Sequence, residues 1–240
     1  MLFLIIEFYN HSGEIYYGFF TGKDTLYNSD AYISLIIDFR IKREIYFYLK
    51  YSSLLEMAEQ QGRVFLDPMF ATYSIVFGIK FKKYLWFDFF MDHYCRHYID
   101  KELEEGKVVF NGEFYSIRNY FRKYDRYDKR YTFNFTYAFY PHAIIVDWLN
   151  SRPFYRHRFI LDTYYKAHKF VLFGNKMEYA ISRADENYPK RGFYRIVPEI
   201  SLFYRNERGV FNLFIDYYFK IKDPFRSPED LLFIGISYNF

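Results

Sequence analysis

Residues 131–140 read Tyr-Thr-Phe-Asn-Phe-Thr-Tyr-Ala-Phe-Tyr. Every second side chain, from Tyr131 to Phe139, is aromatic, and the side chains between them are small or polar. Successive side chains of a β-strand point to opposite faces, whereas an apolar helix face would recur every 3.6 residues. The stretch therefore predicts a strand with one wholly apolar face.

The same alternation recurs along the chain. Its apolar rows are Ile33, Leu35, Ile37, Phe39 and Ile41; Tyr73, Ile75, Phe77, Ile79 and Phe81; and Phe211, Leu213, Ile215, Tyr217 and Phe219. Each row covers about ten residues, which is long for a globular strand but typical of a tilted strand that crosses a membrane.

The composition excludes several other classes of protein. Among 240 residues there are 29 Tyr, 31 Phe and 2 Trp, too many aromatics for a disordered, collagen-like or coiled-coil chain. A single Cys excludes a disulfide framework, and a formal charge of +4 is too small to indicate a nucleic-acid partner. No apolar run approaches the roughly 18 residues of a spanning helix. The start, Met1 to Glu7, lacks the basic region and cleavage site of a complete secretory signal.

Counting the alternating segments predicts twelve strands in a single domain, 1–240, with an N-terminal segment at 1–13 and the strands in 14–240. The predicted strands are 14–21, 31–41, 44–55, 70–81, 84–98, 113–124, 130–140, 154–167, 169–182, 192–205, 209–221 and 231–240. The connections alternate between long and short, as in a transmembrane barrel with long outer loops and short periplasmic turns. Residues 142–150 could form one more strand, but they follow Pro141 and are interpreted as loop.

Charged side chains occupy the rows opposite the apolar ones. They are Asp38, Arg40, Lys50, Asp88, Asp92, Arg96, Arg118, Arg156, Arg158, Asp162, Lys176, Glu178, Arg195, Glu199, Asp216 and Lys220. A soluble lipocalin-like barrel or β-sandwich would turn the apolar rows inward, but their bulk exceeds what one lumen can hold. The pattern therefore favours apolar rows facing lipid and charges facing the lumen. Because unpaired charges are costly in a confined space, we expect ion pairs and a largely occluded lumen.

The last strand ends in Phe240, with Tyr238 two residues earlier and Gly235 five residues before the end. This ending resembles the C-terminal insertion signal of Gram-negative outer-membrane β-barrel proteins, although Phe233 stands where a polar residue is usual. The alternation and the strand count predict an all-β, twelve-stranded antiparallel transmembrane β-barrel. The resemblance implies that this barrel lies in a bacterial outer membrane. It also implies two partners, the membrane lipids and the barrel-assembly machinery that reads the last strand.

One candidate chemical site lies in the predicted strand 84–98. Alternation places His93 and Cys95 on its outward face, and symmetric pairing about the loop 99–112 would bring Asn119 opposite His93. A thiol, an imidazole and an orienting amide form a nucleophile–base–orienter set.

This set resembles the His-x-Ser pair of outer-membrane phospholipase A and of the lipid A 3-O-deacylases, with Cys95 at the position of the serine. The resemblance implies an acyl hydrolase that acts on lipid from the outer barrel wall. The wider run from His93 through Cys95 and His97 to Asp100 also resembles an uncharacterised outer-membrane barrel family. His93 and His97 would sit about 13 Å apart on a strand, too far to share one metal ion. The sequence indicates no cofactor and no metal. The primary interpretation is a barrel with a structural or narrow-pore role, and the hydrolase is the alternative.

Overall fold

The computed structural model describes residues 6–22, 27–58, 67–81, 87–99, 108–119, 125–144, 155–182, 192–221, 228 and 230–240. The strands are β1 (Glu7–Thr21), β2 (Ser29–Lys42), β3 (Ile45–Ala58), β4 (Asp67–Phe81), β5 (Phe87–Tyr98), β6 (Val108–Asn119), β7 (Tyr131–Ile144), β8 (Tyr155–His168), β9 (Val171–Ser182), β10 (Gly192–Arg205), β11 (Val210–Tyr218), β12 (Lys220–Ile221) and β13 (Leu231–Asn239). One short helix, α1 (Asp125–Asp128), precedes β7. No helix in these ranges is long and apolar enough to cross a membrane.

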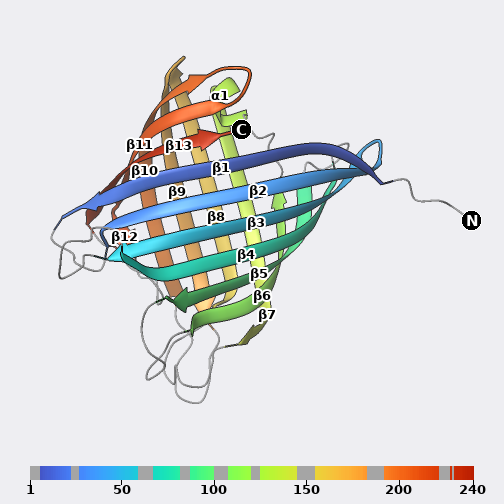
Figure 1. The fold of residues 1–240 in the computed structure, drawn as a ribbon, viewed down its shortest axis with the longest axis horizontal. Helices are drawn as coiled ribbons and strands as arrows, with labels where there is room; N and C mark the ends of the chain where they lie inside the picture. Colours follow the sequence, from blue (N-terminus) through green and yellow to red (C-terminus); the bar gives the residue numbers. More distant parts are fainter. Residues whose placement is uncertain are drawn as a thin grey trace, which may run out of the picture.

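All thirteen described strand segments belong to one antiparallel sheet. Each strand from β1 to β10 pairs with the next along the chain. The pairings then return to the start, because β10 pairs with β11, β11 with β13, and β13 with β1. The short β12 follows β11 in the sequence and pairs with the same strand, β10. The two segments therefore occupy a single strand position in the sheet. In Figure 1, β1 to β5 cross the front of the molecule and the steeper β8 to β10 lie behind them, like the two walls of a barrel.

The chain's two shortest described connections, Arg43–Glu44 and Lys169–Phe170, lie at the same end of the barrel as the C-terminus. We call this the turn end, and the opposite end the loop end. The helix α1 lies at the turn end, beside the last residues of β13 (Figure 1).

Several strand boundaries differ from those predicted. The segment 1–13 is not separate from the barrel, because β1 begins at Glu7 and its first residues pair with β2. The polar His11-Ser12 pair and a bulge between Phe8 and Asn10 interrupt the alternation there. The predicted strand 113–124 is β6, at Val108–Asn119, and the predicted short turn 125–129 contains α1. The strand β7 continues to Ile144, into the stretch interpreted as loop, and residues 145–150 lie outside the described ranges.

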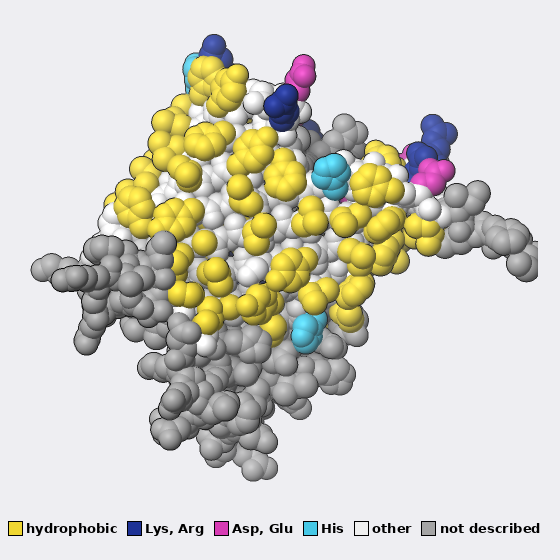
Figure 2. Space-filling model, viewed as in Figure 1, with side chains coloured by type: hydrophobic (Ala, Val, Ile, Leu, Met, Phe, Trp, Pro, Cys, Tyr) yellow, Lys and Arg dark blue, Asp and Glu magenta, His cyan; other side chains and the backbone are white. Residues whose placement is uncertain are grey.

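The outward face of the sheet is apolar, as predicted. Large side chains of the alternating rows are exposed, among them Ile33, Ile75, Phe77, Tyr131, Phe133, Phe135, Phe211 and Leu213. Their small or polar neighbours in sequence, such as Thr132 and Thr136, are buried on the inner face. Figure 2 shows hydrophobic side chains spread over the visible wall, with charged ones gathered at its rim. A soluble sandwich with these aromatics inside is therefore excluded.

Two apolar clusters pack within the lumen. One, at the turn end, consists of Tyr127 from α1 with Leu172, Phe203 and Val210. The other, toward the loop end, consists of Phe20, Leu231 and Phe233. The remainder of the inner face is polar or charged, so the functional chemistry of this fold lies in the lumen.

Candidate functional site in the barrel lumen

Buried ion pairs line the wall formed by β2 to β5. Lys80 Nζ lies 2.6 Å from Asp38 Oδ1, and Arg96 Nε lies 2.8 Å from Glu56 Oε2. Each pair joins strands that are two positions apart in the sheet, so the side chains reach across the strand between them. Pairing is what allows these charges to stay buried, because removing one partner leaves an uncompensated charge.

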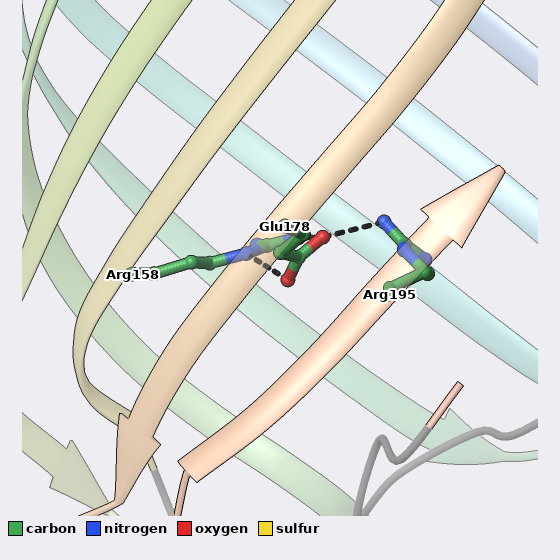
Figure 3. Close-up of polar contacts among 3 residues, drawn as sticks. All are labelled: Arg158, Glu178 and Arg195. Carbon is green, nitrogen blue, oxygen red and sulfur yellow. Dashed lines mark hydrogen bonds and ion pairs between the residues drawn. The ribbon is translucent and has the colours of Figure 1, made fainter. Parts of the chain in front are cut away.

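The wall formed by β8 to β10 carries a triad centred on Glu178. Its Oε1 accepts a hydrogen bond from Arg158 Nε at 2.5 Å, and its Oε2 accepts one from Arg195 Nη2 at 2.7 Å. Figure 3 shows the carboxylate held between the two guanidinium groups, one from β8 and one from β10. The triad has one negative and two positive charges, so this part of the lumen is locally basic.

Most of the predicted lumen charges face inward. Asp88, Asp92 and Asp38 are buried there, and the Tyr48 hydroxyl donates to Asp88 at 3.0 Å. Arg40 instead lies at the rim, where it is exposed and pairs with Glu7. The side chains of Arg118 and Lys220 lie outside the described part of the structure.

The helix α1 is docked into the turn end of the lumen. Asn212 Nδ2, from β11, donates to the Tyr127 hydroxyl at 2.9 Å, and Lys166 Nζ donates to the Tyr127 carbonyl at 2.5 Å. The Tyr127 ring is 2% exposed and packs on Phe203 with ring centroids 4.9 Å apart. Asp128 forms an ion pair with Arg205. The helix is thus held by β8, β10 and β11 at once and narrows the barrel mouth.

Arg126 projects from α1 into the lumen, where its Nη1 donates to the Tyr164 hydroxyl at 3.3 Å. Burial opposes its charge, but Tyr127, Tyr164, Glu199 and Glu14 outweigh this and hold the pKa of the guanidinium well above its usual value. Burial likewise raises the pKa of the Tyr127 phenol. Arg126 therefore stays charged and the phenol stays neutral at ordinary pH.

A cavity of about 260 Å³ lies in the lumen between α1 and the cluster of Phe20, Leu231 and Phe233. Its basic lining residues are Arg126, Lys176 and Arg195, and its acidic ones are Glu14, Glu199 and Asp216. Lys176 is exposed although it lies on the inner face. At about 30 Å³ per water molecule, the cavity has room for about nine waters or one small solute.

Sequence reasoning missed three elements of this site. Glu56 fell in a predicted loop, because β3 runs three residues further than its alternation indicates. Lys80 stands in a polar row of the sequence, but its pairing with Asp38 two strands away follows only from the curvature of the sheet. The docking of α1 left no signal, since a four-residue helix has no periodicity to read.

The structure does not bring together the three residues predicted for acyl hydrolysis. Asn119 pairs with Phe87, six residues before His93 on β5, while Glu113 stands opposite His93 and Asn111 opposite Cys95. The prediction that Asn119 faces His93 is therefore wrong, and the reason is the position of β6. Because β6 begins at Val108, the β5–β6 connection is shorter than the predicted loop 99–112. Each residue of β6 therefore pairs with a different residue of β5 from the one predicted. His93 and Cys95 are partly exposed on β5. Within the described residues, no group of three or more His, Cys, Asp or Glu could hold a metal ion.

The predicted insertion signal lies in β13. Gly235 pairs with Gly18 of β1 and with Phe214 of β11, and the rings of Tyr238 and Phe240 stack with centroids 6.1 Å apart. These residues therefore belong to the strand that closes the sheet.

No protein-family model matches the sequence, and no curated protein matches it. Among solved structures, the chain is similar to NanC porin, with 9% identity, a TM-score of 0.51, and coverage of 95% of this chain and 97% of that one. It also aligns with KdgM porin, at 11% identity and a TM-score of 0.46 over 95% of this chain and 99% of that one. OmpF of Salmonella typhi, solved in complex with daunomycin, aligns at 8% identity and a TM-score of 0.45 over 96% and 97%. The likeness to NanC porin shows the fold, which is an antiparallel β-barrel like that of this porin.

Proposed function

We propose that this chain is a channel of the Gram-negative outer membrane that passes small hydrophilic solutes through a lumen narrowed at the turn end by α1. The observation that carries the proposal is the 260 Å³ cavity inside the barrel, lined by charged and polar side chains. A barrel with a purely structural role can fill its interior with side chains. This one keeps a space in which Lys176 is exposed.

The charge pattern supports permeation of polar molecules. In a narrow pore, a polar solute loses part of its hydration, and polar side chains on the wall must replace it. Asp38, Lys80, Arg158, Glu178 and Arg195 supply such groups along both walls of the lumen. The ion pairs keep these charges in place without making the lumen strongly anionic or cationic.

The docked helix sets the expected size limit. Tyr127 and Arg126 occupy space at the turn end that would otherwise be lumen, and contacts from three strands hold them there. The chain should therefore behave as a narrow channel, unlike the 16–18-stranded porins, which leave a wide aqueous channel.

Swelling of proteoliposomes in isotonic solutions of a pentose, a disaccharide and a trisaccharide tests this proposal. We expect swelling in the pentose, little in the disaccharide and none in the trisaccharide. The Tyr127→Ala variant should admit the disaccharide, whereas Tyr127→Phe, which keeps the ring, should behave as wild type. Swelling no faster than that of empty liposomes in every solute, for wild type and Tyr127→Ala alike, would exclude a channel. Rapid swelling of the wild type in the trisaccharide would contradict the constriction.

A further inference from the structure

The lumen cavity has two unlike walls. One is aromatic, where Tyr16 of β1, Phe214 of β11 and Phe233 of β13 contact one another with ring centroids 5.8 to 6.2 Å apart. The other is charged and comes from β9, β10, β11 and α1, and Glu14 of β1 adds a carboxyl group next to the aromatic wall. A solute in this space meets apolar rings on one side and ionised groups on the other.

The charged wall is ordered along the barrel. The backbone register places Glu199 directly opposite Asp216, so two carboxyl groups lie side by side nearest α1. One step toward the loop end, Lys176 stands opposite Val197, and after one more step Arg195 stands opposite Glu178. A step on one face of a strand is two residues, or about 7 Å. Toward the loop end, the acidic band is therefore followed by a basic band that consists of Lys176, after about 7 Å, and Arg195, after about 14 Å.

Within the described part of the chain, neither Lys176 nor Asp216 forms an ion pair. Asp216 Oδ1 and Asn212 Oδ1 are also buried without a hydrogen-bond partner in that part. Two carboxyl groups opposite each other, as Glu199 and Asp216 are, repel when both are ionised, and Arg126 of α1 is the cation that lines the cavity with them. A bound cationic group would relieve this repulsion and supply the missing donors.

We propose that the cavity is a binding site for a small zwitterion with an apolar side chain, the chemistry of a free α-amino acid. The ammonium group would lie at Glu199 and Asp216, the carboxylate at the end of the Lys176 side chain, and the apolar side chain against Tyr16, Phe214 and Phe233. This inference rests on the proposed channel function and names the class of solute that the channel selects.

The balance of charge argues against solutes of a single sign. Three basic and three acidic side chains line the cavity, so a plain anion or cation meets repulsion as well as attraction. A zwitterion aligned with the two bands meets attraction at both ends. Charge-assisted hydrogen bonds of about 2.8 Å at each end would fix its orientation. The aromatic wall then favours a side chain with apolar surface.

Isothermal titration calorimetry on the folded protein in detergent tests the site without requiring conduction. The probes are L-phenylalanine, 3-phenylpropionate, phenethylamine and glucose. We expect L-phenylalanine to bind at least about ten-fold more tightly than each of the others, which corresponds to about 1.4 kcal/mol. Equal or tighter binding of 3-phenylpropionate, phenethylamine or glucose would overturn the proposal, as would the absence of L-phenylalanine binding.

Two variants give a crossed pattern that a merely structural effect would not produce. Lys176→Met should weaken L-phenylalanine and 3-phenylpropionate and leave phenethylamine unchanged. Asp216→Asn should weaken L-phenylalanine and phenethylamine and leave 3-phenylpropionate unchanged. The matched control is Lys50→Met, a lysine on the inner face of β3 outside the cavity lining, which should change none of the affinities. Equal losses in Lys176→Met and Lys50→Met would overturn the assignment.

The two proposals fail separately. If L-phenylalanine binds with the crossed pattern but no solute enters proteoliposomes, the site stands and the channel function is wrong. If the pentose permeates but none of the probes binds, the channel stands and the zwitterion site is wrong.

Discussion

Lys80 and Asp38 lie 2.6 Å apart on the inner face of the barrel, although their strands, β4 and β2, are separated by β3. Both side chains are nearly inaccessible, at 6% and 12% exposure, and the Lys80 ammonium also lies 4.5 Å from the centre of the Tyr48 ring. Lys80→Met should therefore leave a buried, uncompensated carboxylate and cost about 3–5 kcal/mol of unfolding free energy. Urea unfolding in detergent, followed by the loss of the heat-modifiable folded band, measures this cost.

The exposed pair of Arg40 and Glu7 provides the control for that measurement. Both of these side chains are about half exposed, so Arg40→Met should cost no more than about 1 kcal/mol. The double variant Asp38→Asn with Lys80→Met should recover most of the stability lost by Lys80→Met alone, because it removes both charges. Equal costs at Lys80 and Arg40 would contradict the buried pairing.

Gly78 is packed directly under the Tyr48 ring. A Cβ atom at this position would lie 2.2 Å from the nearest ring atom, so any side chain must displace the ring. Displacement would also disturb the hydrogen bond from the Tyr48 hydroxyl to Asp88. Gly78→Ala should destabilise the barrel by about 1–3 kcal/mol, the usual cost of overpacking. The same urea titration checks this, with Tyr48→Ala plus Gly78→Ala expected to show no additional loss from the glycine change.

Ile75 lies midway along β4 with its side chain 42% exposed on the outer wall. If that wall faces lipid, Ile75→Arg should cost about 2–4 kcal/mol, whereas Tyr131→Arg, at the end of β7, should cost only about 0–1 kcal/mol. Reversible folding into lipid bilayers, compared between the two variants, gives both values. A cost at Ile75 no greater than at Tyr131 would show that this face does not meet the membrane interior.

Tyr127 gives the docking of α1 a dependence on pH. Burial raises the pKa of its phenol, while an undocked phenol would titrate near its ordinary value of about 10. The docked state therefore holds the proton more tightly. The neutral phenol therefore stabilises the docked helix fully below a pH of about 10, and this stabilisation is lost as the pH rises through the pKa of the docked phenol. Conductance across planar bilayers should increase reversibly above pH of about 10 in wild type but not in Tyr127→Phe, which cannot ionise.

The alternation of side chains was sufficient to predict the fold class and which side chains face outward and which face the lumen. Tyr131 to Phe139 and Phe211 to Phe219 are examples, because their period of two continues through whole strands. Strand ends were predicted less well. Residues 108–110, Val-Val-Phe, do not alternate, so β6 was placed too late and Asn119 was assigned to the wrong neighbour.

The contents of the lumen were predicted only in part, for a physical reason. Alternation tells which charges point inward, and Glu178, Arg158 and Arg195 were among them. It does not tell which inward charges meet, since partners such as Lys80 and Asp38 depend on how the sheet curves. The docking of Tyr127 is a tertiary contact with Asn212, 85 residues away, and local sequence carries no trace of it.

Single-channel conductance in planar bilayers, compared between wild type and Tyr127→Ala, tests the central claim most directly. The Tyr127 ring packs on Phe203 and closes part of the turn end, so its removal should free α1 and widen the narrowest part of the lumen. We expect small, discrete openings for wild type and Tyr127→Phe, and a conductance larger by about two-fold or more for Tyr127→Ala. Equal conductance in wild type and Tyr127→Ala, or no conductance in either, would contradict a channel narrowed by α1.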